Sequence, residues 1–318
     1  METLLNVSLP FFGLIAAGYA AGHTRILSAA AAEGLNVFVF WFTLPPFLFM
    51  KMFAAAPEAI LDPRFVLAYS GGGLLCCAIC VTLGRVLFHP PFAQSVIQGM
   101  AAGSGNIGYM GLPIIVAVFG ERMLLPAVSV ILLDSIVMLC LPAALIQFDR
   151  SRSNPGAAAQ GAGIVLALRS VSGALLRNPL IIASAAGLGW GALGIPLPVP
   201  IATFGNLLAN AAAPCALFVL GATLVGRPLT SGIPEIALMS GCKLLLHPAL
   251  VLGLANAVAL DPQLTAVAVV EASLPIAANV FTVARAYDVY AERASSAILF
   301  STVCAVVTVS GFLLYFSP

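Results

Sequence analysis

The chain alternates between long apolar runs and short polar links. A helix needs about twenty consecutive apolar residues to cross a membrane, and each of these runs reaches roughly that length. The pattern therefore predicts ten membrane-crossing helices. We expect them at residues 4–21, 35–55, 64–88, 95–119, 124–148, 171–191, 201–225, 234–259, 263–286 and 294–316.

The longest polar link, residues 149–170, divides these segments into two sets of five, in residues 1–148 and 171–318. Because five is an odd number, the second set must enter the membrane upside down relative to the first. Many secondary transporters consist of such inverted repeats. A membrane β-barrel would instead show alternation in segments of roughly ten residues. The sequence thus predicts an all-α polytopic membrane protein made of two inverted five-helix repeats.

Two of the expected helices contain stretches that disfavour a regular helix. The fourth contains Gly103–Pro113, with the sequence GSGNIGYMGLP, and the ninth contains Glu271–Asn279, with the sequence EASLPIAAN. Glycine weakens helix interiors, and proline removes a backbone donor. Prolines also fall at corresponding places in the second and seventh segments, at Pro45, Pro46 and Pro214. Paired interruptions indicate a transporter site near the membrane centre, so we expect helices 4 and 9 to be broken and to cross there.

The composition excludes a soluble protein. The chain is 61% hydrophobic and only 8% charged, whereas soluble domains carry about 25% charged residues. Its net charge of +1 gives no basis for a nucleic-acid partner. Neither the zinc-protease motif HExxH nor a phosphate-binding P-loop occurs, so we do not expect an enzyme, a cofactor or a metal site.

The basic residues predict the orientation in the membrane. Nine of the 13 lie on the side of the central link, three lie on the other side, and Lys243 falls within a helix. Because positive charge concentrates in the cytoplasm, we place the link there and both termini on the periplasmic or extracellular side of the cell inner membrane. The nine are Arg25, Arg85, Arg150, Arg152, Arg169, Arg177, Arg227, Arg285 and Arg293.

The broken helices predict an anion site. A helix interrupted inside the membrane exposes unpaired N–H groups where its second half begins, and its dipole favours negative charge there. Asn106 adds an amide donor, and Asn279 offers a second one near Pro275. Two alternatives remain open: the glycines could form a tight helix-packing face, and Asn279 could make only an interhelical hydrogen bond. The predicted substrate-binding residues are Gly105, Asn106, Ile107, Gly108, Tyr109, Pro113, Pro275 and Asn279.

Three ionisable residues fall well inside the expected spans: Asp134, Lys243 and Glu271. A lone charge at the membrane centre costs about 2.5–3.5 kcal/mol on insertion scales, so each is expected to face the protein interior. We expect Lys243 to pair with one of the two acids. The group could act as a proton or cation relay, or as a static ion pair that fixes helix packing. For His247, one turn after Lys243, we expect a structural role.

The residues around Asn106 resemble the auxin efflux carrier family. Plant members of this family export auxin, and bacterial members are often assigned to malate or malonate. The short central link is similar to that of the bacterial members. The resemblance covers essentially the whole chain and rests on Gly105–Pro113 (GNIGYMGLP), Arg177–Ile182 (RNPLII), Lys243–Pro248 (KLLLHP), Leu274–Pro275 and Ala284–Tyr287 (ARAY).

This resemblance implies a division of labour among the ten helices. Helices 1, 2, 6 and 7 would form a scaffold that often dimerises, and helices 3–5 and 8–10 would form a moving transport domain. Asn106 matches the asparagine that contacts the substrate carboxylate. Pro275 matches the first of two prolines in the plant pattern, whereas Val280 stands in place of the second.

The sequence therefore predicts a secondary transporter for a small organic anion, a mono- or dicarboxylate such as malonate, malate or an auxin-like acid. We expect it to act in the lipid bilayer as a homodimer, with proton or sodium coupling as an open question. The alternatives are a sodium- or proton-coupled carrier of the bile-acid symporter or antiporter type, an ion channel and a membrane-embedded sensor.

Overall fold

The structure is a computed structural model that describes residues 9–54, 62–153, 178–226 and 232–316. The regular elements in these ranges are all helices or helical turns, and the only β-type pairing in them is a single isolated bridge. The helices of the first half are α1 (Leu9–His23), α2 (Ala29–Phe38), α3 (Leu44–Ala54), α4 (Pro63–Phe88), α5 (Phe92–Gly103), α6 (Leu112–Phe119) and α7 (Leu124–Ser153). Those of the second half are α9 (Pro179–Ala192), α10 (Val199–Thr223), α11 (Ile233–Gly241), α12 (His247–Ala257), α13 (Pro262–Ala272), α14 (Asn279–Ala286) and α15 (Ala291–Phe316).

Short π-helical or 3₁₀ turns connect several of these helices end to end. Three are π-helical, and η4 (Glu121–Met123) is a 3₁₀ turn. The π-helical turns are η2 (Val39–Thr43), η3 (Ile107–Gly111) and η6 (Cys242–Leu246).

Within the described ranges, five helical stretches are long and apolar enough to cross a membrane, and shorter apolar helices accompany them. This confirms a multi-pass helical membrane protein. The five are Ala29–Ala54, Pro63–Phe88, Val199–Thr223, Ile233–Ala257 and Ala291–Phe316.

Several helices begin where the sequence provides an Asp or Asn followed by Pro. The side chain of Asp62 accepts from the N–H of Arg64 at 2.8 Å, Asn178 from Leu180 at 3.0 Å, and Asp261 from Gln263 at 2.9 Å. Each cap satisfies one N–H at the start of a helix, and the following proline needs no donor there. The starts of α4 and α13 lie within a few residues of the predicted ones, whereas α9 begins at Pro179 and the sixth segment was predicted from residue 171.

Two further predicted boundaries were wrong by about one turn or more. The second segment begins at Ala29 rather than residue 35, because the Ser28 hydroxyl caps it by accepting from the N–H of Ala31 at 3.2 Å. The fifth segment continues to Ser153 rather than ending at residue 148, so the helix carries polar residues that the apolar pattern excluded. The rest of the predicted link, 154–170, lies outside the described residues, as do Arg169, Arg177 and Arg227.

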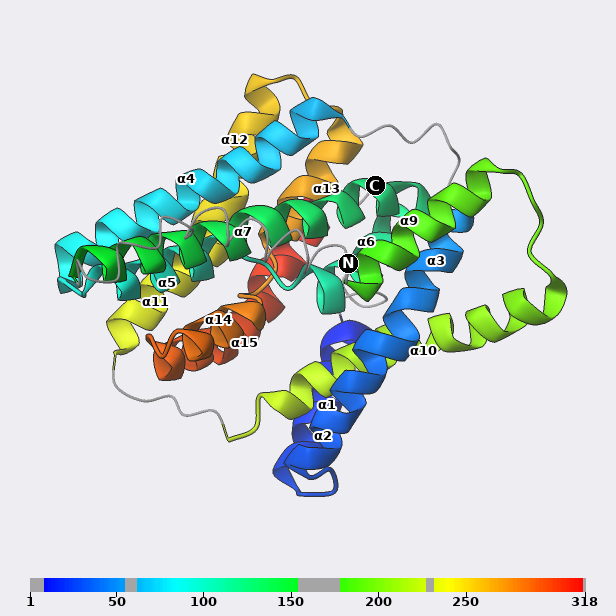
Figure 1. Ribbon diagram of the computed structural model, residues 1–318, viewed down its shortest axis with the longest axis horizontal. Coiled ribbons are helices and arrows are strands. Elements are labelled where there is room, and N and C mark those ends of the chain that lie inside the picture. Colours follow the sequence, from blue (N-terminus) through cyan, green and yellow to red (C-terminus); the bar gives the residue numbers. More distant parts are fainter. Residues whose placement is uncertain (1–8, 55–61, 154–177, 227–231, 317–318) are drawn as a thin grey trace.

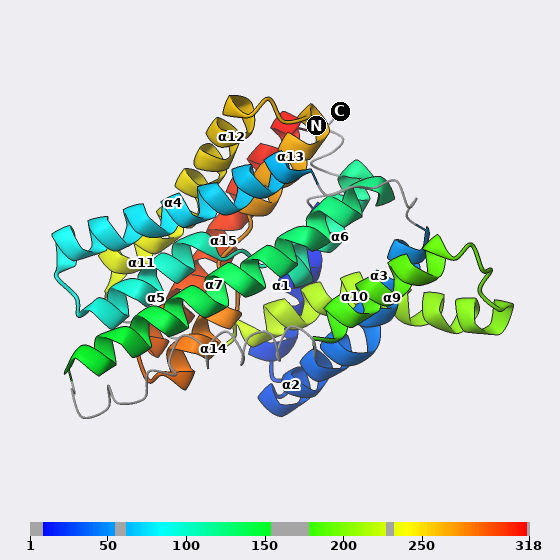
Figure 2. The same cartoon turned by 45° about the horizontal axis from the view of Figure 1, so that its top comes forward.

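The helices pack into two groups (Figures 1 and 2). The small helix group comprises α1, α2, α3, α9 and α10, and the large helix group comprises α4–α7 and α11–α15. In the small group α1 packs along α10, and α3 packs along α9 and α10. In the large group α4 packs along α5 and α12. Both groups thus combine helices from the two halves of the sequence.

Two glycines allow the backbones of α1 and α10 to approach each other closely in the small helix group. A Cβ atom added at Gly18 of α1 would lie 1.8 Å from the backbone oxygen of Phe218 in α10, and one at Gly221 would lie 1.9 Å from the backbone oxygen of Ile15. Small residues at a helix contact let the two backbones approach in this way. The α1–α10 crossing therefore has no room for a larger side chain at either position.

The fourth and ninth segments are interrupted, as their glycine and proline content predicts. Helix α5 ends at Gly103, and the chain turns helical again at Ile107; α13 ends at Ala272, and α14 begins at Asn279. The two interruptions cross in an antiparallel bridge between Gly105 and Ile276. By contrast, α10 runs without a break through Pro214, and a π-helical turn precedes Pro45.

Candidate functional site

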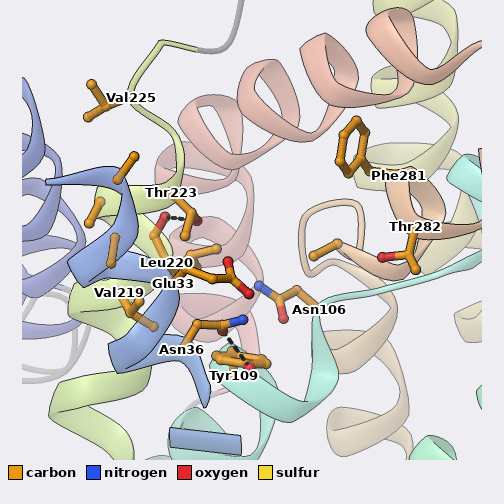
Figure 3. A pocket seen from close by; sticks show the side chains of 14 residues that line it. Glu33, Asn36, Asn106, Tyr109, Val219, Leu220, Thr223, Val225, Phe281 and Thr282 are labelled. Atoms are coloured by element: carbon orange, nitrogen blue, oxygen red, sulfur yellow. Dashed lines mark hydrogen bonds between the residues drawn. The ribbon is translucent and has the colours of Figure 1, made fainter. Parts of the chain in front are cut away.

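A cavity of about 490 Å³ lies beside the crossing of the two interrupted segments. Its walls come from α2 and α10 of the small helix group and from η3 and α14 of the large helix group. This volume suits a small organic ligand, since ligand pockets span roughly 300–1,000 Å³. The polar residues that line it are Glu33, Asn36, Asn106, Tyr109, Thr223 and Thr282 (Figure 3).

Asn106 is held at the crossing by its backbone, which leaves its side chain free. Its N–H donates to the carbonyl oxygen of Pro275 at 2.9 Å, and the N–H of Ala277 donates back to the carbonyl of Ser104 at 3.1 Å. These two bonds satisfy backbone groups that the interrupted helices leave unpaired, as buried backbone requires. The Asn106 amide points into the cavity toward Glu33 (Figure 3).

A second hydrogen bond orders the cavity wall next to Asn106. The hydroxyl of Tyr109 donates to Oδ1 of Asn36 at 2.8 Å, which links η3 to α2 across the two helix groups. Because Oδ1 is the acceptor in this bond, the NH₂ of Asn36 remains a donor for other partners. Asn36 and Asn106 therefore both offer amide donors at this cavity.

The structure brings only some of the predicted binding residues to the cavity. Asn106 and Tyr109 line it. Gly105 and Pro275 supply backbone to the crossing itself, and Ile107 and Pro113 are buried in packing next to it. Gly108 has open space where a side chain would be. Asn279 does not line this cavity; it is half-buried, and its Oδ1 has no hydrogen-bond partner in the described part of the chain.

A buried polar cluster lies directly behind the crossing, formed by Asp134, Lys243, His247 and Glu271. Lys243, His247 and Glu271 are fully buried, and Asp134 is 7% exposed. Lys243 Nζ donates to the backbone oxygen of Ala272 at 2.5 Å and lies 3.1 Å from His247 Nδ1. A water-excluded group of this kind needs internal partners for its charges.

The predicted direct pairing of Lys243 with an acid is not seen. Among the described residues no ion pair joins Lys243 to Asp134 or Glu271, and neither oxygen of Glu271 has a hydrogen-bond partner. Both acids nevertheless lie close enough to interact electrostatically with Lys243. The charges are thus grouped around the crossing without being paired one to one.

Gly105 lies between the buried polar cluster and Asn106, which lines the cavity. A Cβ atom added there would lie 3.3 Å from Lys243 Nζ and 3.2 Å from the backbone oxygen of Glu271. The lysine therefore packs against the backbone of the residue that precedes Asn106. Lys243 thus lies next to the segment that presents the Asn106 amide.

The sequence interpretation missed Glu33, Asn36 and Thr282 as cavity residues, and it missed the contact of His247 with Lys243. A usable signal existed for all of these except Thr282. Glu33 and Asn36 are three residues apart, and Lys243 and His247 are four apart, so each pair shares one face of a helix. Thr282 had no such signal, because its place depends on where α14 restarts.

Comparison with known proteins connects this geometry to transport. Residues 4–313 match the family model described as Membrane transport protein. The chain is 34% identical over 316 residues to a protein of Rhizobium meliloti (strain 1021) named "Putative malonate transporter", covering 98% of this chain and 96% of the relative. It is 25% identical over 301 residues to "Uncharacterized transporter YfdV" of Escherichia coli (strain K12), covering 94% and 93% of the two chains.

A plant relative shows the same full-length similarity. "Auxin efflux carrier component 8" of Arabidopsis thaliana is 23% identical over 352 residues, covering 96% of this chain and 95% of the relative. The family match over nearly the whole chain, together with an apolar helical fold, makes this a transporter and not an enzyme. The chain belongs to the auxin efflux carrier family of membrane transport proteins.

Proposed function

We propose that the protein is a secondary transporter that moves a small organic anion, a mono- or dicarboxylate, across the membrane by alternating access. The observation that carries this proposal is the Asn106 amide, which faces a cavity of about 490 Å³ beside two crossing interrupted helices. Amide N–H groups and the start of a helix are donors suited to a carboxylate. Malonate is the first candidate because of the name of the Rhizobium relative; malate and an auxin-like acid are the others.

The proposed architecture is a ten-helix arrangement of two inverted repeats, residues 1–148 and 171–318, joined by a cytoplasmic link at 149–170. The small helix group would be the scaffold, and the large helix group would be the transport domain. Support comes from the position of the cavity, since α2 and α10 lie on one side of it and η3 and α14 on the other. A shift of one group against the other would expose the cavity first to one side of the membrane and then to the opposite side.

We further propose that the scaffold forms a homodimer in the cell inner membrane, with both termini on the periplasmic side. The excess of Lys and Arg on the side of the central link supports this orientation.

Asp134, Lys243 and Glu271 are proposed to couple transport to a proton or another cation. Their burial behind Gly105 supports this role, because a change of charge in this water-excluded cluster would act on the segment that carries Asn106.

The test is carboxylate transport by Asn106→Ala in proteoliposomes, with Asn256→Ala as the matched control, since Asn256 is exposed on α12. Hydrogen bonds to a charged group contribute about 1.5–3 kcal/mol each, so we expect apparent affinity for the transported acid to fall at least about tenfold. Asn256→Ala should keep wild-type kinetics. Wild-type kinetics in Asn106→Ala, with normal insertion, would refute the proposed site.

A further inference from the structure

The carboxylate of Glu33 and the amide of Asn106 both line the cavity and point toward each other (Figure 3). Glu33 lies in the second turn of α2, in the small helix group, whereas Asn106 belongs to the large helix group. In the described part of the chain, no hydrogen bond or ion pair engages this carboxylate. A ligand that accepts from Asn106 would therefore meet an unpartnered acid at its other end.

No basic side chain among the described residues lines this cavity to offset that acid. The walls from α10 and α14 contribute no charged residue, and η3 contributes one titratable group, the phenol of Tyr109, whose hydroxyl donates to Asn36. Arg25 lies in an adjoining cavity of about 320 Å³, which shares Ala29, Ala32, Ala222 and Val225 with the first. The cavity is thus donor-rich at Asn106 and acceptor-only at Glu33, because an ionised carboxylate has no proton to donate.

From this arrangement we infer that Glu33 determines specificity: the site takes a monoanionic organic acid that carries a second hydrogen-bond donor. A dicarboxylic acid would bind in its singly protonated form rather than as the dianion. This inference rests on the proposed function and names the charge state of its substrate. The ionised carboxylate of the ligand accepts from Asn106, and its protonated carboxyl group donates to Glu33.

The ligand keeps its own acidic proton throughout transport, so this proton does not pass to a protein group, whatever cation the buried cluster couples. In each transport cycle a dicarboxylate then crosses as a monoanion, with one negative charge and one acidic proton. Dicarboxylate transport would accordingly follow the concentration of the singly protonated species, even when the buried cluster behind Gly105 keeps a fixed charge.

The experiment measures malonate dissociation constants for the purified full-length protein from mildly acidic to mildly alkaline pH. Wild type, Glu33→Gln and Glu292→Gln are compared; Glu292 is an acid outside this cavity. We expect wild-type affinity to fall as the second carboxyl group of malonic acid ionises. In Glu33→Gln the dianion should bind about tenfold more tightly than it binds wild type, the order of magnitude for removing one charge repulsion at a water-accessible site. Glu292→Gln should follow wild type.

A simple monocarboxylate separates titration of the ligand from titration of the protein. Propionate does not change charge over this pH range, so its affinity for the wild type should stay flat. A malonate profile in Glu33→Gln identical to that of wild type would overturn the role of Glu33, and so would a propionate profile as steep as that of malonate. Failure of the transport proposal looks different, since then no carboxylate binds the wild type at any pH, or Asn106→Ala binds as wild type does.

Discussion

The backbone N–H of Asn106 donates to the carbonyl oxygen of Pro275 at 2.9 Å, and this bond joins the first half of the sequence to the second at the point where both helices are interrupted. A return bond from Ala277 to Ser104 completes the bridge. The pairing lets irregular backbone exist in the interior of a membrane protein, where every polar backbone group needs a partner. It also fixes the place from which the Asn106 side chain enters the cavity.

Replacement by alanine is predicted to destabilise the protein at Gly105 but not at Gly108. In Gly105→Ala the new methyl group would lie within 3.3 Å of Lys243 Nζ and 3.2 Å of the backbone oxygen of Glu271, which is tighter than ordinary contact. We expect lower thermal stability and a loss of transport. Gly108→Ala is the matched control, because the space beside Gly108 is open and alanine favours a helix over glycine by about 0.5–1 kcal/mol. Equal unfolding midpoints and transport rates for the two variants would contradict this view of the crossing.

Glu271 gives a prediction about pH. Its carboxyl group is fully buried, has no hydrogen-bond partner among the described residues and lies close enough to Lys243 to interact electrostatically. If the buried cluster couples transport to protons, Glu271→Gln should flatten or displace the pH dependence of transport, because the variant cannot ionise at this position. Transport rates in proteoliposomes over a pH series check this, with Glu292→Gln as a control acid variant. An unaltered profile would remove Glu271 from any relay.

Lys243 can be tested independently of pH. Lys243→Gln keeps a hydrogen-bond donor on a shorter side chain, removes the charge near Asp134 and Glu271 and alters the contact with His247. We expect dicarboxylate transport to fall strongly while the protein still inserts, since uncompensated acids remain in a water-excluded cluster. Intact dicarboxylate transport in this variant would instead assign the cluster a structural role.

Lys51 and Glu121 form an ion pair between α3 of the small helix group and η4 of the large helix group. Exposed pairs contribute only about 0–1 kcal/mol to stability, so Lys51→Gln should barely change the unfolding midpoint. If the two helix groups move against each other, however, the pair must break in each cycle, and Lys51→Gln should change the transport rate. The charge reversal Lys51→Glu with Glu121→Lys should restore it. If Lys51→Gln and the two single charge reversals all leave the transport rate unchanged, the Lys51–Glu121 ion pair stays formed during transport.

The sequence alone predicted the interruptions but not all the side chains around them. Glycine and proline content located both breaks and singled out Asn106, because these are local backbone properties. Glu33 was missed because a charged residue at the edge of an apolar run was interpreted as lying before the helix, whereas the Ser28 cap starts α2 earlier. The direction of Asn279 could not be predicted either, since it depends on how α14 is rotated after the break. The partners of Lys243 depend on packing between elements far apart in the sequence.

A last prediction concerns a half-buried network at the start of α15. Glu235 of α11 accepts from Arg293 at 2.5 Å and from the hydroxyl of Tyr290, and Gln98 of α5 donates to the same tyrosine at 2.9 Å. Burial and the adjacent Glu235 carboxylate raise the pKa of Tyr290 above its usual value, so the phenol keeps its proton and serves as a donor. The network thus ties three helices of the large helix group together.

Glu235→Ala removes the common acceptor of this network. The Glu235 side chain is only 13% exposed, so the groups that it paired lose a partner away from bulk water, and we expect a loss of about 1–3 kcal/mol in the free energy of unfolding. Glu121→Ala is the comparison, because the side chain of Glu121 is 52% exposed and its ion pair is worth about 1 kcal/mol at most. Thermal unfolding of both variants in detergent measures the difference. The expected order is a clearly lower midpoint for Glu235→Ala, and the opposite order would mean that the network at α15 does not hold the large helix group together.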